Sequence, residues 1–360
     1  MNKDQKTSVT HLLYVNSYRG SGIGDFGFDL AKHFDVWGPV NVEYLETKAS
    51  WSNFAYNWLR IFLFHSLVIV NLGFTSYGKS ASRNFLNFLF LGITTNILRR
   101  KVRVILHDSP ELTAREASGY RFFTIMKIGA AVATRLLKRA SVHVFSKTLY
   151  NILVSKYKFR RASFHPFPCM RQPVDSIISR FSNPLLLNIG YIAPYKGLEI
   201  LADIKELNPD LKCVVVGGFH PVLSKTSDGQ QYMKVLTLKL KEASVKVVGF
   251  LSDEDLGGLI TDHKCISILP YITTSGSSYA AIFSIEMGIP VIASNLEEFR
   301  VLQENGAGIQ IVNRTVLDMS HAIQELLGDE FRYEKVVASN VSYCRKYSAL
   351  RLISDLLNIP

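Results

Sequence analysis

The chain has 360 residues, more than one hydrophobic core usually holds, so its length predicts two domains. Hydrophobic residues make up 48% of it, which excludes a disordered protein and supplies apolar surface for two cores. The net charge of +11 is unevenly spread, because residues 1–180 hold 25 Lys and Arg against 10 Asp and Glu. That basic half predicts an anionic partner of its own.

The N-terminal residues and the spacing of the cysteines predict the cellular compartment. The first ten residues are polar and lack the apolar core of a signal peptide. Residues 54–74 form the most apolar long segment, but Arg60 and His65 interrupt it, so a buried strand is favoured over a membrane span. The cysteines lie far apart without metal-ligand spacing, which argues against a structural zinc or disulfides. The predicted compartment is the reducing cytoplasm.

The first half reads as alternating strands and helices of a parallel α/β domain. Strands are expected at 11–16, 42–46, 61–71, 102–106 and 142–146, and helices at 83–100 and 120–139. A glycine turn, Gly20 to Gly24, follows the first strand and leads into a helix starting near Asp25. Its backbone could approach a phosphate, but the spacing fails the GxGxxG pattern, and a tight turn without a ligand is the alternative.

Two further features of this half predict ligands. His107 and Asp108 directly follow a buried strand, where open α/β sheets bind ligands, although a simple turn before Pro110 also explains them. The helices at 83–100 and 120–139 mix Phe and Leu with Lys and Arg, which favours an anionic membrane surface. The common alternative is a helix whose charges merely face water. Nucleic acid is disfavoured, because no binding-module pattern is present.

Residues 164–184 contain four prolines and separate the two halves. The predicted organisation is a Rossmann-like domain at 1–168, a linker at 169–184, a second Rossmann-like domain at 185–330 and a C-terminal helix at 331–360. That last segment could reach back to the first domain. In the second half, strands are expected at 185–189, 212–216, 245–248, 265–269 and 291–293, and helices at 196–206, 231–242, 315–327 and 333–357.

Two helix starts in the second half are polar. Ser252 to Asp255 allows a divalent metal site, but a serine three residues before an acid at a helix start favours a cap. Residues 273–278 are rich in Ser, Thr and Gly, and precede a helix between two buried strands. Their amides and hydroxyls predict an anion site, and an ordinary capped helix is the alternative.

Three motifs then resemble one family. Residues 188–197 (NIGYIAPYKG) resemble the GRLxxxKG turn of retaining family-4 glycosyltransferases, 248–256 resemble their nucleobase loop, and 288–294 (GIPVIAS) resemble their GxPVIAS strand. The likeness extends over 185–312 and is looser over 9–170. The chain is thus similar to GT-B glycosyltransferases, whose α/β fold has two Rossmann-like domains facing each other across a cleft.

The resemblance implies a nucleotide-sugar donor as substrate and no metal or other cofactor. Lys196 would pair with the donor diphosphate, and His107 would lie near the transferred sugar, both as catalytic residues. The donor-binding residues would be Gly22, Gly24, Tyr191, Phe250, Leu251, Ser275, Gly276, Ser277, Ser278 and Glu286.

The chain also departs from the family. The family's diphosphate arginine aligns with Tyr191, and its paired glutamates align with Ser275 and Phe283. Glu286 lies one helical turn beyond Phe283 and could take over the ribose contact. The hydroxyls and amides of residues 274–278 could replace the lost contact to the sugar.

The leading hypothesis is a retaining, metal-independent hexosyltransferase that acts on a lipid-linked or polysaccharide acceptor. Its basic N-terminal half would bind the anionic inner face of the cell membrane, making the protein cytoplasmic and peripheral. Catalysis would consist mainly of stabilising the charge that develops on the departing phosphate. The alternative is a non-catalytic GT-B binding or scaffold subunit of a glycosyltransferase assembly, which the missing arginine and glutamates favour.

Overall fold

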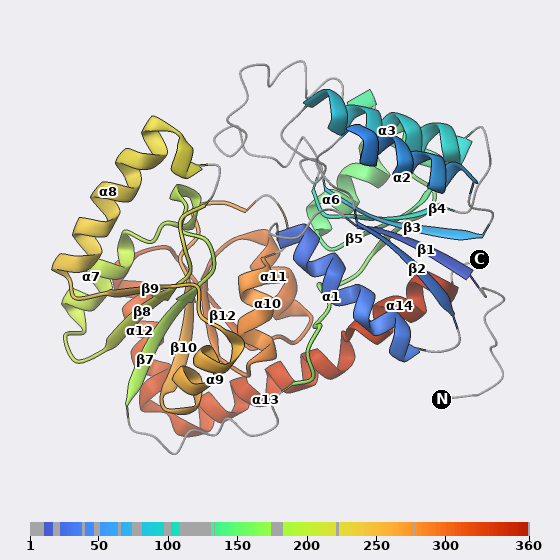
Figure 1. Ribbon diagram of the computed structural model, residues 1–360. Coiled ribbons are helices and arrows are strands. Elements are labelled where there is room, and N and C mark those ends of the chain that lie inside the picture. Colours follow the sequence, from blue (N-terminus) through green and yellow to red (C-terminus); the bar gives the residue numbers. More distant parts are fainter. Residues whose placement is uncertain are drawn as a thin grey trace. The chain divides into compact units, whose positions relative to one another are not determined.

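The computed structural model forms two compact α/β units (Figure 1). The first comprises Met1–Met170, Ser275–Ser277 and Tyr347–Pro360, and the second comprises Arg171–Thr274 and Ser278–Lys346. The structure describes residues 11–16, 22–37, 40–46, 51–63, 66–73, 81–96, 102–108, 131–132, 134–173, 183–220, 223–274, 276 and 278–358. Both units contain a parallel sheet with helices, so the predicted α/β class is confirmed.

The described part of the first unit is built on a six-stranded sheet in the order β2-β1-β3-β4-β5-β6. Its strands are β1 (His11–Asn16), β2 (Asn41–Glu46), β3 (Leu67–Leu72), β4 (Val102–Leu106), β5 (Ser141–Val144) and β6 (Ala162–Phe164). All pair in parallel. The central strands β1 and β3 are buried along almost their whole length because helices cover both faces of the sheet.

Helices α1 (Gly22–Trp37) and α14 (Ala349–Asn358) lie on one face of this sheet, and α2 (Trp51–Leu63) and α3 (Ala81–Asn96) lie on the other (Figure 1). Residues 131–132 and 134–136 are also helical, and short helical turns follow at Leu137–Arg139, Lys147–Asn151 (α6) and Ile152–Lys156. The predicted helix at 120–139 lies outside the described residues up to 130, and the end of the one at 83–100 is likewise outside after 96.

The second sheet has the order β12-β11-β10-β7-β8-β9. Its strands are β7 (Pro184–Ile189), β8 (Lys212–Val216), β9 (Lys246–Gly249), β10 (Lys264–Leu269), β11 (Val291–Ser294) and β12 (Ile309–Val312). Counted from β7, this is the 3-2-1-4-5-6 order of a Rossmann fold. Its helices are α7 (Ile200–Leu207), α8 (Ser227–Glu242), α9 (Asp253–Thr261), α10 (Tyr279–Glu286), α11 (Glu297–Glu304), α12 (Val316–Gly328) and α13 (Glu330–Lys346).

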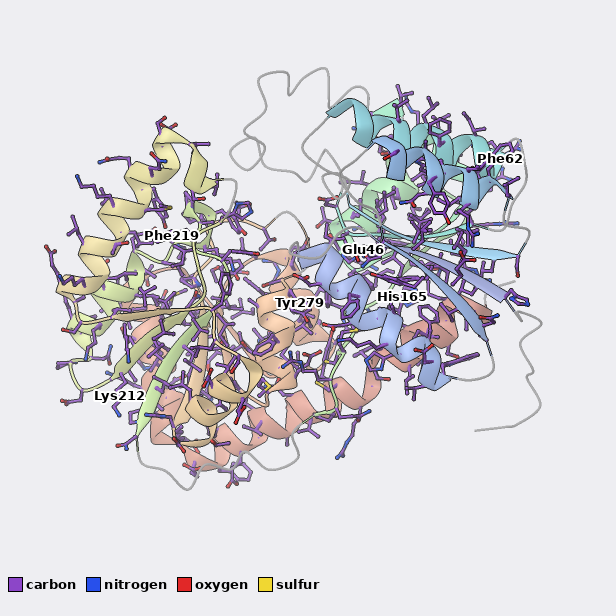
Figure 2. The ribbon with its side chains drawn as sticks, in the orientation of Figure 1. Glu46, Phe62, His165, Lys212, Phe219 and Tyr279 are labelled. Atoms are coloured by element: carbon purple, nitrogen blue, oxygen red, sulfur yellow. The ribbon has the colours of Figure 1, made fainter. Side chains whose placement is uncertain are left out.

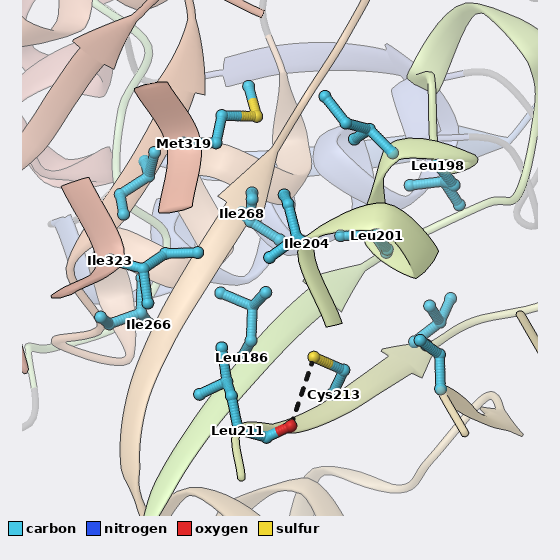
Figure 3. Packing of buried hydrophobic residues seen from close by; sticks show 14 of the residues in the cluster. Leu186, Leu198, Leu201, Ile204, Leu211, Cys213, Ile266, Ile268, Met319 and Ile323 are labelled. Atoms are coloured by element: carbon cyan, nitrogen blue, oxygen red, sulfur yellow. Dashed lines mark hydrogen bonds between the residues drawn. The ribbon is translucent and has the colours of Figure 1, made fainter. Parts of the chain in front are cut away.

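Two apolar layers hold the second sheet. On one face, Leu186, Ile266 and Ile268 of the strands pack with Ile204 of α7 and Ile323 of α12 (Figure 3). A second cluster combines other strand residues with side chains of α9 and α10: Leu185, Leu187, Leu256, Ile260 and Phe283. Alternate strand residues thus enter opposite layers, as the pleat of a strand requires.

Several predicted elements were wrong in extent, among them the helix predicted at 231–242, which starts at Ser227, and the strand predicted at 142–146, which ends at Val144. The strand predicted at 61–71 begins only at Leu67, because the residues up to and including Leu63 belong to α2. The first helix starts at Gly22 rather than near Asp25, so Gly22 and Gly24 lie in its first turn. The helix predicted at 196–206 starts at Ile200, because Gly197 adopts a φ of 61° and ends a 3₁₀ turn at Pro194–Lys196.

The helix predicted at 333–357 is two helices. Between Lys346 and Ala349 the backbone pairs with Cys169 instead of continuing the helix. The N–H of Cys169 donates to the carbonyl oxygen of Tyr347, and the carbonyl oxygen of Cys169 accepts from the N–H of Ala349, both at 2.8 Å. The chain after this break, α14, packs with α1 in the first unit. The division after Met170 falls within the segment predicted as linker.

The predicted cap at Ser252 is confirmed, since its hydroxyl oxygen accepts from the backbone N–H of Asp255 at 3.0 Å. Across the described ranges, no helix is both long and apolar enough to span a bilayer.

Helix α2 is apolar on both of its sides. Trp58 and Ile61 are buried against the sheet, whereas Tyr56, Leu59, Phe62 and Leu63 are 45–56% exposed. These four residues recur at helical spacing and form one stripe, here called the α2 stripe. Figure 2 places Phe62 at the periphery of the first unit.

Candidate functional site

The candidate site of the second unit lies where the order of its strands reverses. In open α/β sheets, helices leave in opposite directions at such a point, so the carboxyl ends of the two strands there frame a binding site. In this sheet the point lies between β7 and β10. Lys196 stands on the turn that follows β7, and Tyr271 stands two residues after β10 ends.

Lys196 is buried, with 6% of its surface exposed. Its Nζ donates to the phenol oxygen of Tyr271 at 2.8 Å and lies 4.8 Å from the centre of that ring. Burial alone lowers the pKa of the Lys196 ammonium, but electrostatic interactions with Tyr271 and Tyr195 and the hydrogen bond to Tyr271 outweigh it and leave the pKa above its ordinary value. The side chain is therefore a fixed cation at neutral pH.

Glycines bring the backbone close to this cation. A Cβ on Gly190 would lie only 3.0 Å from the Lys196 Nζ, and Gly190 has a φ of 114°. Gly217, at the end of β8, has a φ of 145°, and a Cβ there would lie 2.0 Å from the carbonyl oxygen of Gly190. These two positions require glycine, because any side chain would displace the turn from Lys196.

The start of α10 lies beside the same phenol. Ser278 caps this helix by accepting from the N–H of Ala281 at 3.3 Å, and its hydroxyl lies 3.5 Å from the Tyr271 oxygen. Tyr271 therefore links the ammonium to the helix start. Both are positive poles, and together they suit an anion. The predicted Ser275 and Ser277 lie outside the described residues. Gly276 is described as a bend, assigned to the first unit.

An aromatic group borders the Gly190 turn. The Tyr191 ring centre lies 5.6 Å from that of His220 and 5.4 Å from that of Phe250, both edge to face. Phe250 is 65% exposed and lies over Gly218, where a Cβ would come within 2.7 Å of the ring. Burial first, and then the charge of Lys196, lower the pKa of His220. The group offers a neutral, stackable surface beside the cation.

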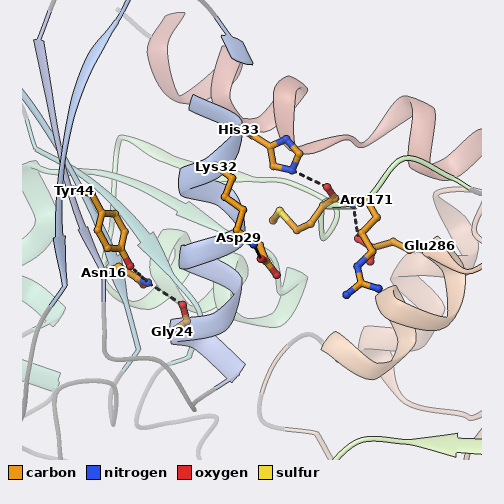
Figure 4. Close-up of polar contacts among 9 residues, drawn as sticks. Asn16, Gly24, Asp29, Lys32, His33, Tyr44, Arg171 and Glu286 are labelled. Atoms are coloured by element: carbon orange, nitrogen blue, oxygen red, sulfur yellow. Dashed lines mark hydrogen bonds and ion pairs between the residues drawn. The ribbon is translucent and has the colours of Figure 1, made fainter. Parts of the chain in front are cut away.

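Two predicted donor-binding residues, Leu251 and Glu286, contact other parts of the second unit. Leu251 is half-buried and packs against the apolar layer of α9 and α10. Glu286 is fully buried at the end of α10, where its Oε1 accepts from the backbone N–H of Arg171 at 3.3 Å (Figure 4). The Arg171 guanidinium lies 4.7 Å from the ring centre of Phe283, on the same helix. This carboxylate thus holds the segment that begins the second unit, and its predicted ribose contact gains no support.

In the first unit, strand order reverses between β1 and β3, and two buried asparagines occupy that point. Asn71 donates through Nδ2 to the Oδ1 of Asn16 and to the carbonyl oxygen of Ile23, each at 2.8 Å. Asn16 donates to the carbonyl oxygen of Gly24 at 2.8 Å and to the phenol of Tyr44 at 3.0 Å (Figure 4). The described part of the predicted glycine turn, Gly22 to Gly24, is thus the asparagine-held first turn of α1, and Gly20 lies outside the described residues.

His107 joins this network. Its Nε2 lies 2.6 Å from the Oδ1 of Asn71, an amide oxygen that can only accept, so Nε2 carries the proton and Nδ1 keeps a lone pair. Phe26 and Phe145 stand against the imidazole, with ring centres 4.8 and 5.4 Å away. Burial lowers the pKa of His107 to about 3. The side chain is neutral at physiological pH, a polar contact rather than a cation.

Tyr271, Asn16, Asn71 and His220 were absent from the sequence prediction. The first three lie at or just beyond the carboxyl ends of strands that border a reversal, and that position was a usable signal. Within the described ranges, no three His, Cys, Asp or Glu side chains gather as metal ligands would.

Comparison with known proteins identifies the family of the second unit. Residues 178–341 match the family model of the glycosyl transferases group 1, a range that contains Lys196, Tyr271 and α10. These residues make up most of the second unit, which is therefore identified as a group 1 glycosyltransferase domain. No curated protein shows significant sequence similarity to this chain.

Solved structures show the same GT-B fold over the whole chain. HepE of Anabaena, solved with UDP and glucose, has 15% identity and a TM-score of 0.68, covering 98% of this chain and 100% of that one. Sucrose-phosphate synthase of Thermosynechococcus elongatus has 14% identity and a TM-score of 0.69, covering 96% and 98%. A glycosyltransferase of Rickettsia africae has 14% identity and a TM-score of 0.65, covering 97% and 98%.

The protonation state of His107 makes a prediction about stability in acid. The pKa of His107 is about 3 in the folded protein against an ordinary 6.5. Between these two pH values the unfolded chain binds a proton on His107 that the folded chain does not. The contribution of neutral His107 to the free energy of unfolding is therefore complete above pH 6.5, and it is lost as the pH falls from 6.5 towards 3. In urea titrations, the unfolding free energy of the wild type should decline more steeply than that of His107→Gln between pH 6.5 and about pH 4. A constant difference between the two would contradict a neutral His107.

Proposed function

We propose that this group 1 glycosyltransferase transfers a hexosyl group from a nucleotide-sugar donor, with retention of configuration and without a metal cofactor. The observation that carries the proposal is the buried Lys196 ammonium, held by Tyr271 beside the start of α10 within the region that matches the family. A nucleoside diphosphate is the leaving group of such a transfer, and it needs positive charge where the sugar departs.

The geometry suits a diphosphate without a metal ion. A lysine ammonium has three N–H donors, and Tyr271 is the one hydrogen-bond partner found for it among the described residues. The glycine backbone at Gly190 leaves room for an anion to approach that cation. Because these groups are already in place, stabilising the departing phosphate needs little reorganisation. In retaining enzymes of this class, that phosphate is thought to assist attack from the same face of the sugar.

The nucleotide part of the donor has a matching surface. Tyr191 and Phe250 present ring faces and edges beside the cation, and Phe250 is mostly exposed. A base packed there would stand next to a diphosphate on Lys196. Support for a uridine donor comes from HepE, which was solved with UDP and glucose. In the first unit, neutral His107 would serve as a hydrogen-bonding contact for the transferred sugar, with Gly22 and Gly24 near the phosphates.

Lys196→Met tests the assigned role. The variant keeps an unbranched side chain of similar length but removes the charge, so we expect kcat/KM for transfer or donor hydrolysis to fall about 100-fold or more. Lys239→Met, at a half-buried lysine that pairs with Asp203 at 2.7 Å, is the matched control and should keep full activity. Circular dichroism would verify the fold of both. Unchanged turnover in Lys196→Met would refute the role, and a wild type without turnover on any nucleotide sugar would favour a scaffold subunit.

We further propose a lipid-linked or polysaccharide acceptor, reached from the inner face of the cell membrane in polysaccharide biosynthesis. Support comes from the α2 stripe, which exposes four large apolar side chains on a helix already packed by its other face. The half of the chain that carries it has 25 Lys and Arg against 10 Asp and Glu. Apolar insertion combined with a basic surface is how peripheral proteins bind anionic bilayers.

Vesicle sedimentation tests this membrane proposal. The wild type should sediment with vesicles containing phosphatidylglycerol and stay in the supernatant with phosphatidylcholine alone. Leu59→Ser/Phe62→Ser should lower the bound fraction about fivefold or more, since each exposed apolar side chain adds buried area. The control Val235→Ser/Leu238→Ser removes two exposed apolar residues from α8 instead and should bind as the wild type does. Equal recovery with both lipids, or equal loss in both variants, would remove the claim.

A further inference from the structure

A single arginine joins the two segments that carry Lys196 and Tyr271. Arg314 lies between β12 and α12, and its Nε donates to the carbonyl oxygen of Pro270 at 2.8 Å. Its Nη2 donates to the carbonyl oxygen of Gly197 at 3.3 Å and pairs with Glu199 at 2.5 Å. One acceptor thus directly precedes Tyr271, and the other directly follows Lys196.

The local backbone is shaped around this guanidinium. Gly197 has a φ of 61°, and a Cβ there would lie 2.5 Å from the Arg314 Nη2 and 2.5 Å from the Pro270 oxygen. One further bond ties the same two segments, from the N–H of Ile272 to the carbonyl oxygen of Tyr195 at 2.8 Å. The separation between the Lys196 turn and the end of β10 is therefore set by the bonds of Arg314 together with this backbone bond and the bond between Lys196 and Tyr271.

These contacts leave Arg314 unsuited to binding the donor diphosphate itself. Its Nε and Nη2 are engaged by two backbone carbonyls and a carboxylate, with side-chain exposures of 30% for Arg314 and 40% for Glu199. A planar guanidinium can hold several acceptors in fixed directions, which a lysine ammonium cannot. Its charge is neutralised locally by Glu199, so it does not replace the diphosphate arginine that Tyr191 stands in for.

We propose that Arg314 is a positioning residue, which acts on the donor diphosphate through Lys196 by clamping the 194–199 turn to the 270–272 segment. This inference rests on the proposed function for its effect on activity, but the clamp itself does not depend on it. Misplacing a catalytic group by about 1 Å can cost about 100-fold in rate. Releasing the turn therefore impairs Lys196 even though Arg314 never touches the substrate.

Lysine labelling tests the clamp without any substrate. With an amine-reactive ester and mass spectrometry, buried Lys196 should label slowly in the wild type, and about tenfold faster in Arg314→Ala, because the turn is released. The control Arg300→Ala removes a half-buried arginine of the same unit that pairs with Glu297 at 2.7 Å, and should leave the Lys196 labelling rate unchanged. Equal labelling of Lys196 in all three proteins would overturn the proposal.

A double-mutant cycle separates positioning from general damage. Arg314→Ala should lower kcat/KM about 10- to 100-fold in the wild-type background but only slightly when Lys196 is already Met, since both changes remove one interaction. The same loss in both backgrounds would contradict positioning. A wild type without transfer activity would refute the proposed function, while faster labelling would still uphold the clamp. Should Arg314→Ala not fold, Arg314→Lys gives the same comparison, because one ammonium cannot reach all three acceptors.

Discussion

The hydrogen bond between the buried ammonium of Lys196 and the phenol of Tyr271 is the interaction on which the site depends. A cation enclosed by protein is costly unless polar groups compensate it, and the structure supplies a neutral partner instead of a carboxylate. That choice leaves the positive charge available to an incoming anion. The glycines at 190 and 197 then follow, because each is placed where a side chain would meet the cation or the arginine that fixes its turn.

The first unit has buried neutral amides, rather than a cation, at the point where its strand order reverses. At its strand reversal, Asn16 and Asn71 use both ends of their side chains, holding the first turn of α1 and orienting His107. The aromatic rings around His107 keep it uncharged. Each unit therefore presents a different kind of polar group at the corresponding place in its sheet. One offers a fixed charge, and the other offers oriented hydrogen-bond donors and acceptors.

Several strands of the fold could be predicted from the sequence. Buried strands such as β1, β4 and β8 were predicted to the residue, because their apolar runs are bounded by polar or glycine residues. Residues that matter through long-range contacts could not be. Arg314 lies 117 residues from Gly197 along the chain, and no local pattern relates the two. Helix α2 was partly read as a strand, because a helix with apolar residues on both sides loses its periodic signal.

Titration of the protein with UDP by calorimetry tests the central claim most directly, namely that Lys196 holds a diphosphate without a metal. The measurement is made once with a chelator and once with added magnesium. The account predicts binding of equal affinity in both, weakening with salt, because the anchoring cation belongs to the protein. No binding of UDP or any other nucleoside diphosphate, or binding only with magnesium present, would contradict it.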